Sequence, residues 1–346
     1  MKILVRGTNW VGDAVMTIPA LRELRRIFPE SHIALHTRSW ARGIFEDADF
    51  IDEILTYEPE KSKIKTILEQ SKILREHEFD LAVLFPNSLE SALIVRLAQI
   101  PKRFGYARDG RSFLLSNAVE IPGWKNERHE VFYYLNLVAE IEKSYFGTQT
   151  VLTAAPRLDL SVSAERRATA KEILAKNGVD LSKKTIALGV GSTNSRAKRW
   201  HTESYARLND RLQNELGANV VLVGTKDELK VSREVFEKSL AKPVILTGKT
   251  NLSEAVAVLS EIDLLVSNDT GLAHVAPAVG TQTLVIFGPT DERTTQPIGS
   301  EIIRKKVECA PCMLRDCPID HRCMTRISAD EVFEKAKRKL NAEFDR

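Results

Sequence analysis

The sequence predicts an α/β protein with two doubly wound domains, each a parallel sheet covered by helices. Short apolar runs alternate along the chain with longer amphipathic runs, which is typical of parallel strands joined by crossover helices. Most of the apolar runs lead directly into a glycine turn or a helix. At 346 residues the chain is too long for one ordinary core, so we expect two domains of roughly 150 to 180 residues.

The candidate strands form two series along the chain. The first series covers residues 2–5, 32–36, 53–56, 81–85 and 103–106, with helices between them. The second series covers residues 185–189, 219–223, 243–246, 264–267 and 283–287.

The stretch between the two series predicts a linker and a surface helix. Residues 163–177 are polar and helix-forming, follow an irregular segment that contains Pro156, and lead into Gly178. We therefore place the first domain at residues 1–162 and the second at residues 163–328. We expect the C-terminal helix, residues 329–346, to pack back on the first domain.

Composition excludes several classes of protein. The chain has 50 Lys and Arg against 47 Asp and Glu, so it lacks the global basic field that a nucleic-acid partner requires. No apolar run approaches the roughly 20 residues of a membrane span. The N-terminus enters a strand and a glycine turn at once, which leaves no room for a signal peptide and predicts a cytoplasmic protein.

The segment 264–274 predicts an anion site, because a buried strand runs directly into a small-residue turn that opens a helix. Thr270 and Gly271 can present the free amides of the helix N-terminus to a phosphate. His274 lies one turn further on the same face, where its imidazole can donate to a phosphate or sugar oxygen. The structural alternative is that Asp269 is only an N-cap and His274 only a core histidine.

A second strand-turn-helix lies at residues 5–16, where two glycines precede Asp13. Ligands of open α/β sheets bind beyond the carboxyl ends of the strands, so with two domains we expect the site in the cleft between them. Asp13 can be an N-cap worth about 1 kcal/mol. It can equally be a general base that takes a proton from an acceptor hydroxyl.

Together, several motifs resemble the heptosyltransferases of lipopolysaccharide inner-core assembly, glycosyltransferase family nine. They are Gly12-Asp13 with residues 18–21, Asp269-Thr270-Gly271-Leu272-Ala273-His274, residues 287–291, and the loop 191–200. The cysteine segment, Cys309-Ala310-Pro311-Cys312 with Cys317 and Cys323, is similar to the heptosyltransferase II branch of that family. The resemblance covers essentially the whole chain.

The resemblance implies a GT-B fold and an inverting, metal-independent transfer of heptose from ADP-heptose, without a cofactor. It implies that the second domain binds the nucleotide sugar. The first domain would then bind a lipid-anchored core oligosaccharide that carries phosphate or carboxylate groups, with peripheral contact at the cytoplasmic face of the inner membrane. Two alternatives remain: a GT-B-like nucleotide-sugar epimerase, and a non-catalytic nucleotide-sugar-binding protein.

The resemblance also assigns roles to individual residues. It makes Asp13 the base and places Lys198, Thr193 and Asn194 beside the nucleotide phosphates. It places Glu228 near the ribose, where a shift of one residue would put Asp227 instead. Around the pyrophosphate it places Asp269, Thr270, Gly271 and His274. From the residues alone, Lys198 could lie in a solvated basic loop, Thr193 and Asn194 could be turn residues, and Glu228 could be a surface residue.

Two further groups of residues carry hypotheses. Arg108 and Arg111 lie in a basic segment whose guanidinium forks suit an anionic acceptor, although a solvated loop is the alternative. Four cysteines, with His321 among them, lie between Cys309 and Cys323. In a reducing compartment such clustering suggests a structural zinc or a redox pair, or else thiols that pack as small hydrophobic groups. No other metal site is expected.

Overall fold

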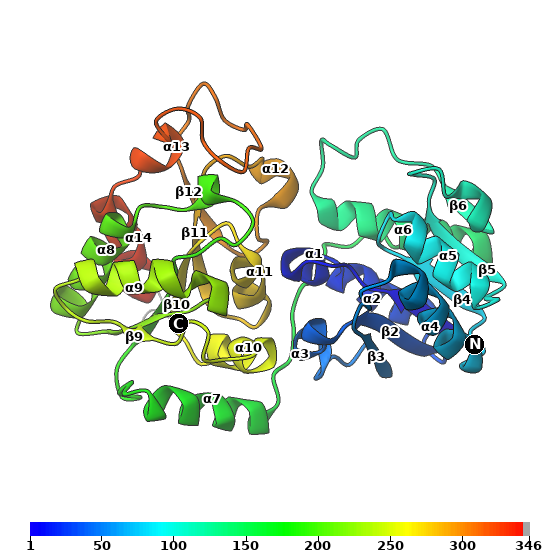
Figure 1. Cartoon of the computed structure of the whole chain (residues 1–346), viewed down its shortest axis with the longest axis horizontal. Coiled ribbons are helices and arrows are strands. Elements are labelled where there is room, and N and C mark those ends of the chain that lie inside the picture. Colours follow the sequence, from blue (N-terminus) through cyan, green and yellow to red (C-terminus); the bar gives the residue numbers. More distant parts are fainter. Residues whose placement is uncertain (342–346) are drawn as a thin grey trace. The chain divides into compact units, whose positions relative to one another are not determined.

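The computed structural model describes residues 1–341, and its chain divides into two compact units (Figure 1). The first unit is Met1–Leu158 and the second begins at Asp159. The predicted boundary lay between residues 162 and 163. Each unit contains one sheet of six parallel strands, which confirms the two doubly wound α/β domains. Within residues 1–341, no helix combines the length and the hydropathy that a membrane span requires.

The sheet of the first unit has the strand order β3-β2-β1-β4-β5-β6. This is the order of dinucleotide-binding folds, and it reverses direction between β1 and β4. Five of its strands lie where the apolar runs predict them. The sixth, β6, was not predicted, because it contains only two consecutive apolar residues and so shows no apolar run. The strands are β1 (Lys2–Arg6), β2 (His32–Arg38), β3 (Glu53–Tyr57), β4 (Leu81–Leu84), β5 (Lys102–Tyr106) and β6 (Asn117–Val119).

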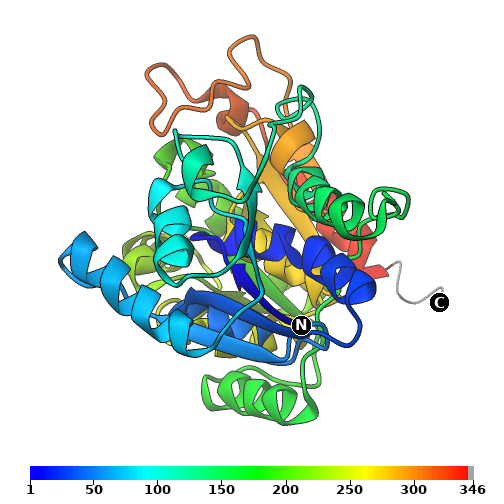
Figure 2. The ribbon, with the colours of Figure 1, turned by 90° about the vertical axis from the view of Figure 1, so that its right-hand side faces the viewer.

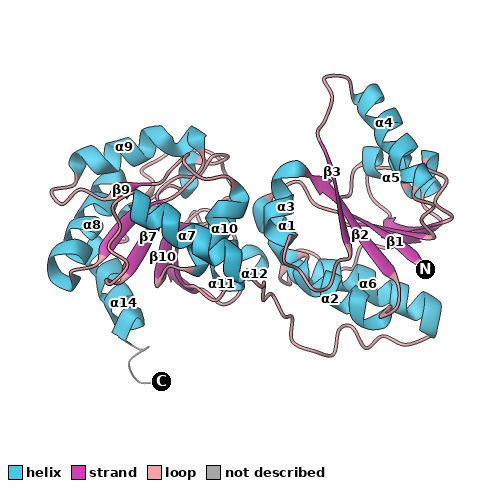
Figure 3. Cartoon of the chain, turned by 90° about the horizontal axis from the view of Figure 1, so that it is seen from below, coloured by secondary structure: helices cyan, strands magenta, loops and turns pink. Residues whose placement is uncertain are grey.

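Helices cover both faces of this sheet. Figure 3 shows α2 and α6 on one face and α4 and α5 on the other, and each pair is in mutual contact. The helices are α1 (Val11–Met16), α2 (Ile18–Ile27), α3 (Arg42–Phe45), α4 (Lys63–Glu76), α5 (Leu89–Leu97) and α6 (Glu130–Phe146), with short 3₁₀ turns η1 (Ser39–Ala41) and η2 (Ser112–Leu114).

The second sheet repeats this topology with the order β12-β11-β10-β7-β8-β9. The order in which the chain adds strands reverses between β7 and β10. These two strands are parallel neighbours, with Ser267 opposite Gly189. The edge strand β12 was not predicted. The strands are β7 (Thr185–Gly189), β8 (Asn219–Leu222), β9 (Val244–Ile245), β10 (Leu264–Asn268), β11 (Gln282–Phe287) and β12 (Glu301–Arg304).

The predicted surface helix at 163–177 is confirmed as α7. The Ser163 hydroxyl caps it by accepting from the Arg166 backbone N–H, and only Ala170 and Leu174 are buried. The helices of this unit are α7 (Ala164–Lys176), α8 (Thr202–Leu216), α9 (Leu229–Lys238), α10 (Leu252–Ser260), α11 (Gly271–Ala278), α12 (Glu292–Thr295), α13 (Arg322–Thr325) and α14 (Ala329–Asn341), with 3₁₀ turns η3 (Arg196–Lys198) and η4 (Lys226–Glu228).

The C-terminal helix was expected to pack on the first domain. Its described part, α14, packs on α8, β10 and β11 of its own unit. Its apolar stripe of Val332, Phe333, Ala336 and Leu340 belongs to the core cluster of the second sheet. The sequence shows only that this stripe must be covered, and the structure shows that α8 and the second sheet cover it. Residues 342–346 of the predicted helix lie outside the described residues.

A buried cation lies at the carboxyl end of β1. Arg6 is 3% exposed, and its guanidinium donates to Gln70 Oε1 at 2.9 Å and to His36 Nδ1. Arginine can only donate, so Nδ1 must accept and the proton of neutral His36 lies on Nε2. Burial and the adjacent Arg6 charge hold the pKa of His36 well below its usual range.

The first unit should therefore lose stability in acid. A histidine whose pKa is lower in the folded state makes its full contribution to the free energy of unfolding above its unfolded pKa of about 6.5. This contribution falls as the pH drops below that value. We expect the free energy of unfolding to be about 2 kcal/mol lower at pH 5 than at pH 7.5 from this group alone. Urea unfolding of wild type and His36→Gln at both pH values measures the difference. An identical pH dependence in the two proteins would contradict the assignment.

Candidate functional site

The loops that follow β7 and β10 meet at the point where the second sheet reverses direction, which is where such sheets bind ligands. The two strands approach closely there. A Cβ atom on Gly189 would lie 2.4 Å from Ser267 Oγ, so only glycine fits at the end of β7. Ser267 Oγ in turn lies 3.2 Å from Thr270 Oγ1 at the start of α11.

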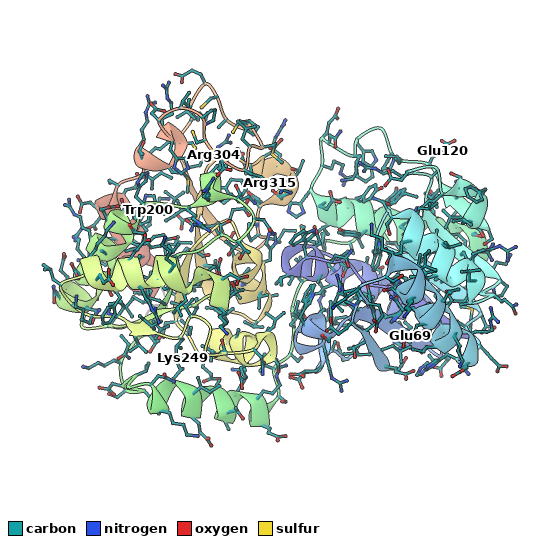
Figure 4. All side chains as sticks on the ribbon, in the orientation of Figure 1. Glu69, Glu120, Trp200, Lys249, Arg304 and Arg315 are labelled. Carbon is teal, nitrogen blue, oxygen red and sulfur yellow. The ribbon has the colours of Figure 1, made fainter. Side chains whose placement is uncertain are left out.

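Asn268, the last residue of β10, holds the loop 190–200 at both ends. Its Nδ2 donates to the carbonyls of Val190 and Gly191, each at 3.0 Å. Its Oδ1 accepts from the Trp200 backbone N–H at 2.9 Å and from the Tyr205 hydroxyl at 3.1 Å. Asn268 is fully buried, and both atoms of its side-chain amide form hydrogen bonds, so it fixes the loop against the strand. Trp200, at the end of this loop, is labelled in Figure 4.

Lys198, in this loop, contacts Asp269, the residue that follows β10. Its Nζ lies 2.7 Å from Asp269 Oδ2, and the Thr290 hydroxyl donates to the same oxygen at 2.7 Å. Asp269 is 5% exposed, whereas the Lys198 side chain is 26% exposed. An ammonium group has three donors, so Lys198 keeps two for a ligand after Asp269 has oriented it. Lys198 therefore does not lie in a solvated basic loop, which was the alternative interpretation of this segment.

The helix α11 begins beside this ion pair. Its N-cap is Thr270, not Asp269, and no side chain caps the first turn. Thr270 and Gly271 are half-buried, and His274 is buried within the first turn. The structure thus brings Lys198, Asp269, Thr270 and Gly271 to one place, where a lysine and a helix N-terminus together favour an anion. The alternative that Asp269 serves as the cap is wrong.

Glu228 belongs to the same surroundings. It is 7% exposed, and its Oε2 accepts from the Thr225 backbone N–H at 2.8 Å, as the N3 residue of a capping box at η4. A Cβ atom on Gly191 would lie 2.3 Å from Glu228 Oε1, so the glycine leaves the space that the carboxylate occupies. Asp227, the alternative candidate for the residue near the ribose, is exposed, and this favours Glu228 for that position. Thr193 and Asn194 are exposed on the loop that follows Gly191.

The cysteine segment buttresses the Lys198 loop. The Ala197 backbone N–H donates to the Arg315 carbonyl at 2.9 Å, and His321 Nε2 lies 2.6 Å from the Ala197 carbonyl. The Pro289 carbonyl accepts from the Cys312 N–H at 3.0 Å, one residue before Thr290. Residues 309–321 therefore support the two segments that carry the partners of Asp269, which are Lys198 and Thr290. These residues are orange at the top of Figure 2, and Arg315 is labelled in Figure 4.

The thiols of this segment do not form a recognisable metal centre. Cys309 and Cys312 are exposed, Cys317 is half-buried and Cys323 is buried. Across residues 1–341, no group of three or more His, Cys, Asp or Glu is placed to hold a metal ion. Burial, and after it the other thiols, raises the pKa of Cys323 to about 11. Its Sγ lies 3.3 Å from where a Cβ atom on Gly288 would be, which is the packing of a small hydrophobic group.

Asp13 lies in the first unit, where the loop after β1 leads into α1 at the point where that sheet reverses direction. It is half-buried and stands in the first turn of α1, whose N-cap Trp10 makes no side-chain capping bond. Burial and, after it, the Asp13 carboxylate raise the pKa of Tyr134 well above its usual range. The nearby phenol stays protonated, so it adds no competing negative charge beside Asp13.

Arg108 and Arg111 have different environments. Arg108 is about half exposed and lies 3.7 Å from Asp109. Arg111 is fully buried, and its guanidinium donates to three carbonyls and two side chains. Burial lowers its pKa to about 10. Its acceptors are the carbonyls of Tyr106, Pro86 and Ser88, Ser91 Oγ and Asn87 Oδ1. This placement favours a structural role for Arg111 over contact with an acceptor.

Arg111→Ala should therefore destabilise the first unit. We expect the free energy of unfolding to fall by about 3 kcal/mol or more, because truncation removes all five hydrogen bonds of a buried guanidinium and leaves a cavity in its place. Arg108→Ala is the matched control and should change it by less than about 0.5 kcal/mol. Urea denaturation measures both variants. Equal unfolding midpoints for Arg111→Ala and wild type would show that the buried contacts carry no stability.

Three residues that were not predicted to act here complete the second-unit site. Asn268 holds the loop 190–200, Thr290 donates to Asp269, and His321 bonds the residue before Lys198. Asn268 and Thr290 lie in motifs that signal the site, directly before and after glycine turns. His321 has no signal of this kind, because its partner is 124 residues away in the chain.

Comparisons with known proteins give matches over most of the chain. The sequence model of glycosyltransferase family 9 (heptosyltransferase) matches residues 67–322. Lipopolysaccharide heptosyltransferase 2 of Salmonella typhimurium is 30% identical over 311 residues, which is 86% of each protein. Lipooligosaccharide heptosyltransferase 2 of Campylobacter jejuni is 25% identical over 98% of each. The solved structure of E. coli ADP-heptose lps heptosyltransferase II has a TM-score of 0.85, with 26% identity over 99% of both chains.

Proposed function

Because the chain belongs to glycosyltransferase family 9, the heptosyltransferases, we propose that it transfers heptose from ADP-heptose to the inner core of lipopolysaccharide. The observation that carries the proposal is the Lys198–Asp269–Thr290 arrangement at the N-terminus of α11. It offers a lysine and free helix amides to an anion at the reversal point of a parallel sheet. A nucleoside diphosphate sugar presents such an anion next to its reactive carbon.

The second unit binds the donor in this proposal. The pyrophosphate accepts from the two remaining donors of Lys198 and from the amides of Thr270 and Gly271, with His274 on the same turn. Thr193 and Asn194 contact the phosphates from the loop after β7. Glu228 Oε2 is engaged by Thr225, so Oε1 is the oxygen that accepts from a ribose hydroxyl.

The reaction is a single displacement that inverts the anomeric carbon. The acceptor hydroxyl oxygen forms a bond to that carbon, the bond to the ADP oxygen breaks, and Asp13 takes the hydroxyl proton. Negative charge develops on the departing pyrophosphate. In this proposal Lys198 and the α11 N-terminus stabilise that charge without a metal ion. Asp269 orients Lys198 and does not act as the base, because Lys198 and Thr290 both bind its Oδ2 atom.

The first unit binds the acceptor, a lipid-anchored core oligosaccharide with phosphate or carboxylate groups. The enzyme works in the cytoplasm, in peripheral contact with the inner membrane. Arg108 is the exposed arginine of the predicted pair and supplies a contact to an acceptor anion. Arg108→Ala should raise the acceptor KM about fivefold, close to the 1 kcal/mol of one exposed ionic contact. Steady-state kinetics should show an unchanged KM for ADP-heptose, and unchanged values for both substrates would remove Arg108 from the site.

One assay tests the function. The protein is incubated with ADP-heptose, or with UDP- and GDP-sugars, in the presence and absence of a lipid A core acceptor, and the products are identified by mass. We expect one heptose added to the acceptor, from ADP-heptose alone. Conversion of the donor without acceptor would identify an epimerase. Binding of ADP-heptose without any product would identify a non-catalytic binding protein.

A further inference from the structure

The buried arginine at the end of β1 has no acidic partner. Arg6 is 3% exposed and forms no ion pair within residues 1–341. Its guanidinium donates only to uncharged groups, which are Gln70 Oε1, His36 Nδ1 and the Tyr57 hydroxyl at 3.4 Å. Its Nε atom has no acceptor in this part of the chain. Buried charges are normally paired because their desolvation is costly, so an arginine without a counter-ion requires an explanation.

Arg6 and its neighbours share one face of the first sheet, at its carboxyl edge. Arg6 lies opposite His36 in the register of β1 and β2, and Arg38, two residues further along β2, lies opposite Tyr57 of β3. Residues two positions apart on a strand point to the same face. The three strands lie side by side in Figure 3, and their carboxyl ends form the edge at which sheets of this kind bind ligands.

Two side chains at this edge have hydrogen-bond donors without an acceptor. Arg38 is half-buried, and its side chain makes no hydrogen bond or ion pair with any residue that the structure describes. Its guanidinium carbon lies 5.6 Å from the centre of the Tyr57 ring, and that of Arg6 lies 4.8 Å from the same centre. The Tyr57 hydroxyl accepts from Arg6, and its own proton has no acceptor among residues 1–341. Arg38 and Tyr57 can therefore both donate to an external group.

The acidic residues near this edge do not pair with the two arginines. Glu58 follows Tyr57 and accepts from the Ser39 hydroxyl. Glu90, in the first turn of α5, interacts electrostatically with Arg6 but forms no ion pair within the described part of the chain. His36 is neutral, as its contact with Arg6 requires. The two guanidinium groups are therefore charged groups without a direct counter-ion.

We propose that Arg38 and Tyr57 form an anion subsite, with the buried charge of Arg6 behind them. The ligand is a phosphate or carboxylate group of the acceptor, which accepts from the Arg38 guanidinium and from the Tyr57 hydroxyl. Arg6 donates to the same hydroxyl oxygen and so strengthens Tyr57 as a donor. The bound anion supplies the negative charge that Arg6 lacks. This inference rests on the proposed function, which brings an anionic acceptor to the first unit.

The strand order places this subsite and Arg108 on opposite sides of the strand that leads to Asp13. In the order β3-β2-β1-β4-β5, β1 precedes Asp13, β2 ends at Arg38, and Arg108 follows β5. Three strand spacings, about 14 Å, separate β2 from β5. The acceptor is therefore held by anionic groups on both sides of the hydroxyl that Asp13 deprotonates. This defines the substrate class as a sugar with at least two separated negative charges.

Kinetics with modified acceptors test the subsite. Arg38→Gln should raise the acceptor KM about tenfold and leave the KM for ADP-heptose unchanged, and Tyr57→Phe, which removes only the hydroxyl, should raise the acceptor KM about fivefold. Each variant is compared with wild type on three acceptors: intact, dephosphorylated, and with its carboxylates converted to methyl esters. The effect of the substitution should disappear on the acceptor that lacks the bound group, and this identifies the group as a phosphate or a carboxylate. Arg96→Gln, at an exposed arginine in the last turn of α5, is the control and should change no KM.

A binding measurement separates the subsite from the proposed function. Protein with ¹³C-labelled histidine is titrated with inorganic phosphate and, separately, with acetate, at constant ionic strength. His36 contacts Arg6, so its resonance, assigned by its absence in His36→Gln, reports on an anion at the subsite. At least one of the two anions should shift this resonance in wild type and leave it unchanged in Arg38→Gln.

The two experiments give distinct outcomes. An Arg38→Gln effect of equal size on all three acceptors would overturn the subsite, as would a His36 resonance that responds to neither anion or responds equally in both proteins. Arg6 would then have only a structural role. A shift that depends on Arg38, in a protein that transfers heptose to no acceptor, would reject the proposed function and leave the anion subsite in place.

Discussion

Asp13→Asn should reduce heptose transfer by roughly 100-fold or more and leave ADP binding intact, as expected for removal of a general base. The substitution keeps the size of the side chain and removes its capacity to take a proton. Asp13 lies in the first turn of α1, where the loss of its charge costs about 1 kcal/mol or less, so α1 should remain folded. The kcat for transfer and the Kd for ADP, measured by calorimetry on the same preparation, check both parts of the expectation.

The control for this variant is Asp49→Asn, which removes another carboxylate of the first unit, one that is exposed and paired with Arg22. It should leave both kcat and Kd unchanged. Full transfer by Asp13→Asn would exclude Asp13 as the base and return it to a structural role in α1. A loss of ADP binding together with transfer would instead indicate that the substitution disturbs the donor site.

Lys198→Ala should lower kcat by roughly 100- to 1,000-fold, the cost of removing a preorganised group that stabilises charge developing on a leaving oxygen. The structure adds a second effect. Asp269 is 5% exposed, and without Lys198 its carboxylate keeps only the Thr290 hydroxyl among its side-chain partners. Burial of a charge that has lost its cation is unfavourable, so the second unit should also unfold at a lower temperature.

The double variant Lys198→Ala, Asp269→Asn separates these effects. It removes the uncompensated charge, so thermal stability should largely recover. Transfer should stay low, because the pyrophosphate still lacks its cation. Recovery of transfer in the double variant would show that Lys198 only neutralises Asp269 and does not act on the leaving group. Differential scanning calorimetry and steady-state kinetics of the three variants provide the comparison.

Local patterns predicted the sheets and the segments of the sites. Ten strands follow from apolar runs, and the helix after residue 268 follows from the small-residue turn. These features depend on neighbouring residues, which is why they can be predicted from the sequence. The edge strands β6 and β12 escaped prediction because each contains only two consecutive apolar residues and so shows no apolar run.

Roles that depend on distant contacts could not be predicted in the same way. Arg108 and Arg111 are three positions apart and look alike in sequence. Arg108 is exposed, whereas the Arg111 guanidinium donates to a carbonyl at the end of β5 and to one in the loop after β4. The stripe of α14 shows that it must be covered, and only packing shows that α8 and the second sheet cover it. In both cases burial decides the role of the residue, and burial is a property of the whole unit.

The sequence by itself determined two parallel α/β sheets and the strand-turn-helix that we propose as an anion site, because periodicity and turn residues act over a few positions. The resemblance to a known family supplied the ligand that we propose for it. Only the tertiary structure decided that Thr270 caps α11, that Asp269 orients Lys198 from 71 residues away, and that Asn268 and His321 hold the lysine loop. Those contacts join segments that come together only when the second unit folds, so no local pattern encodes them.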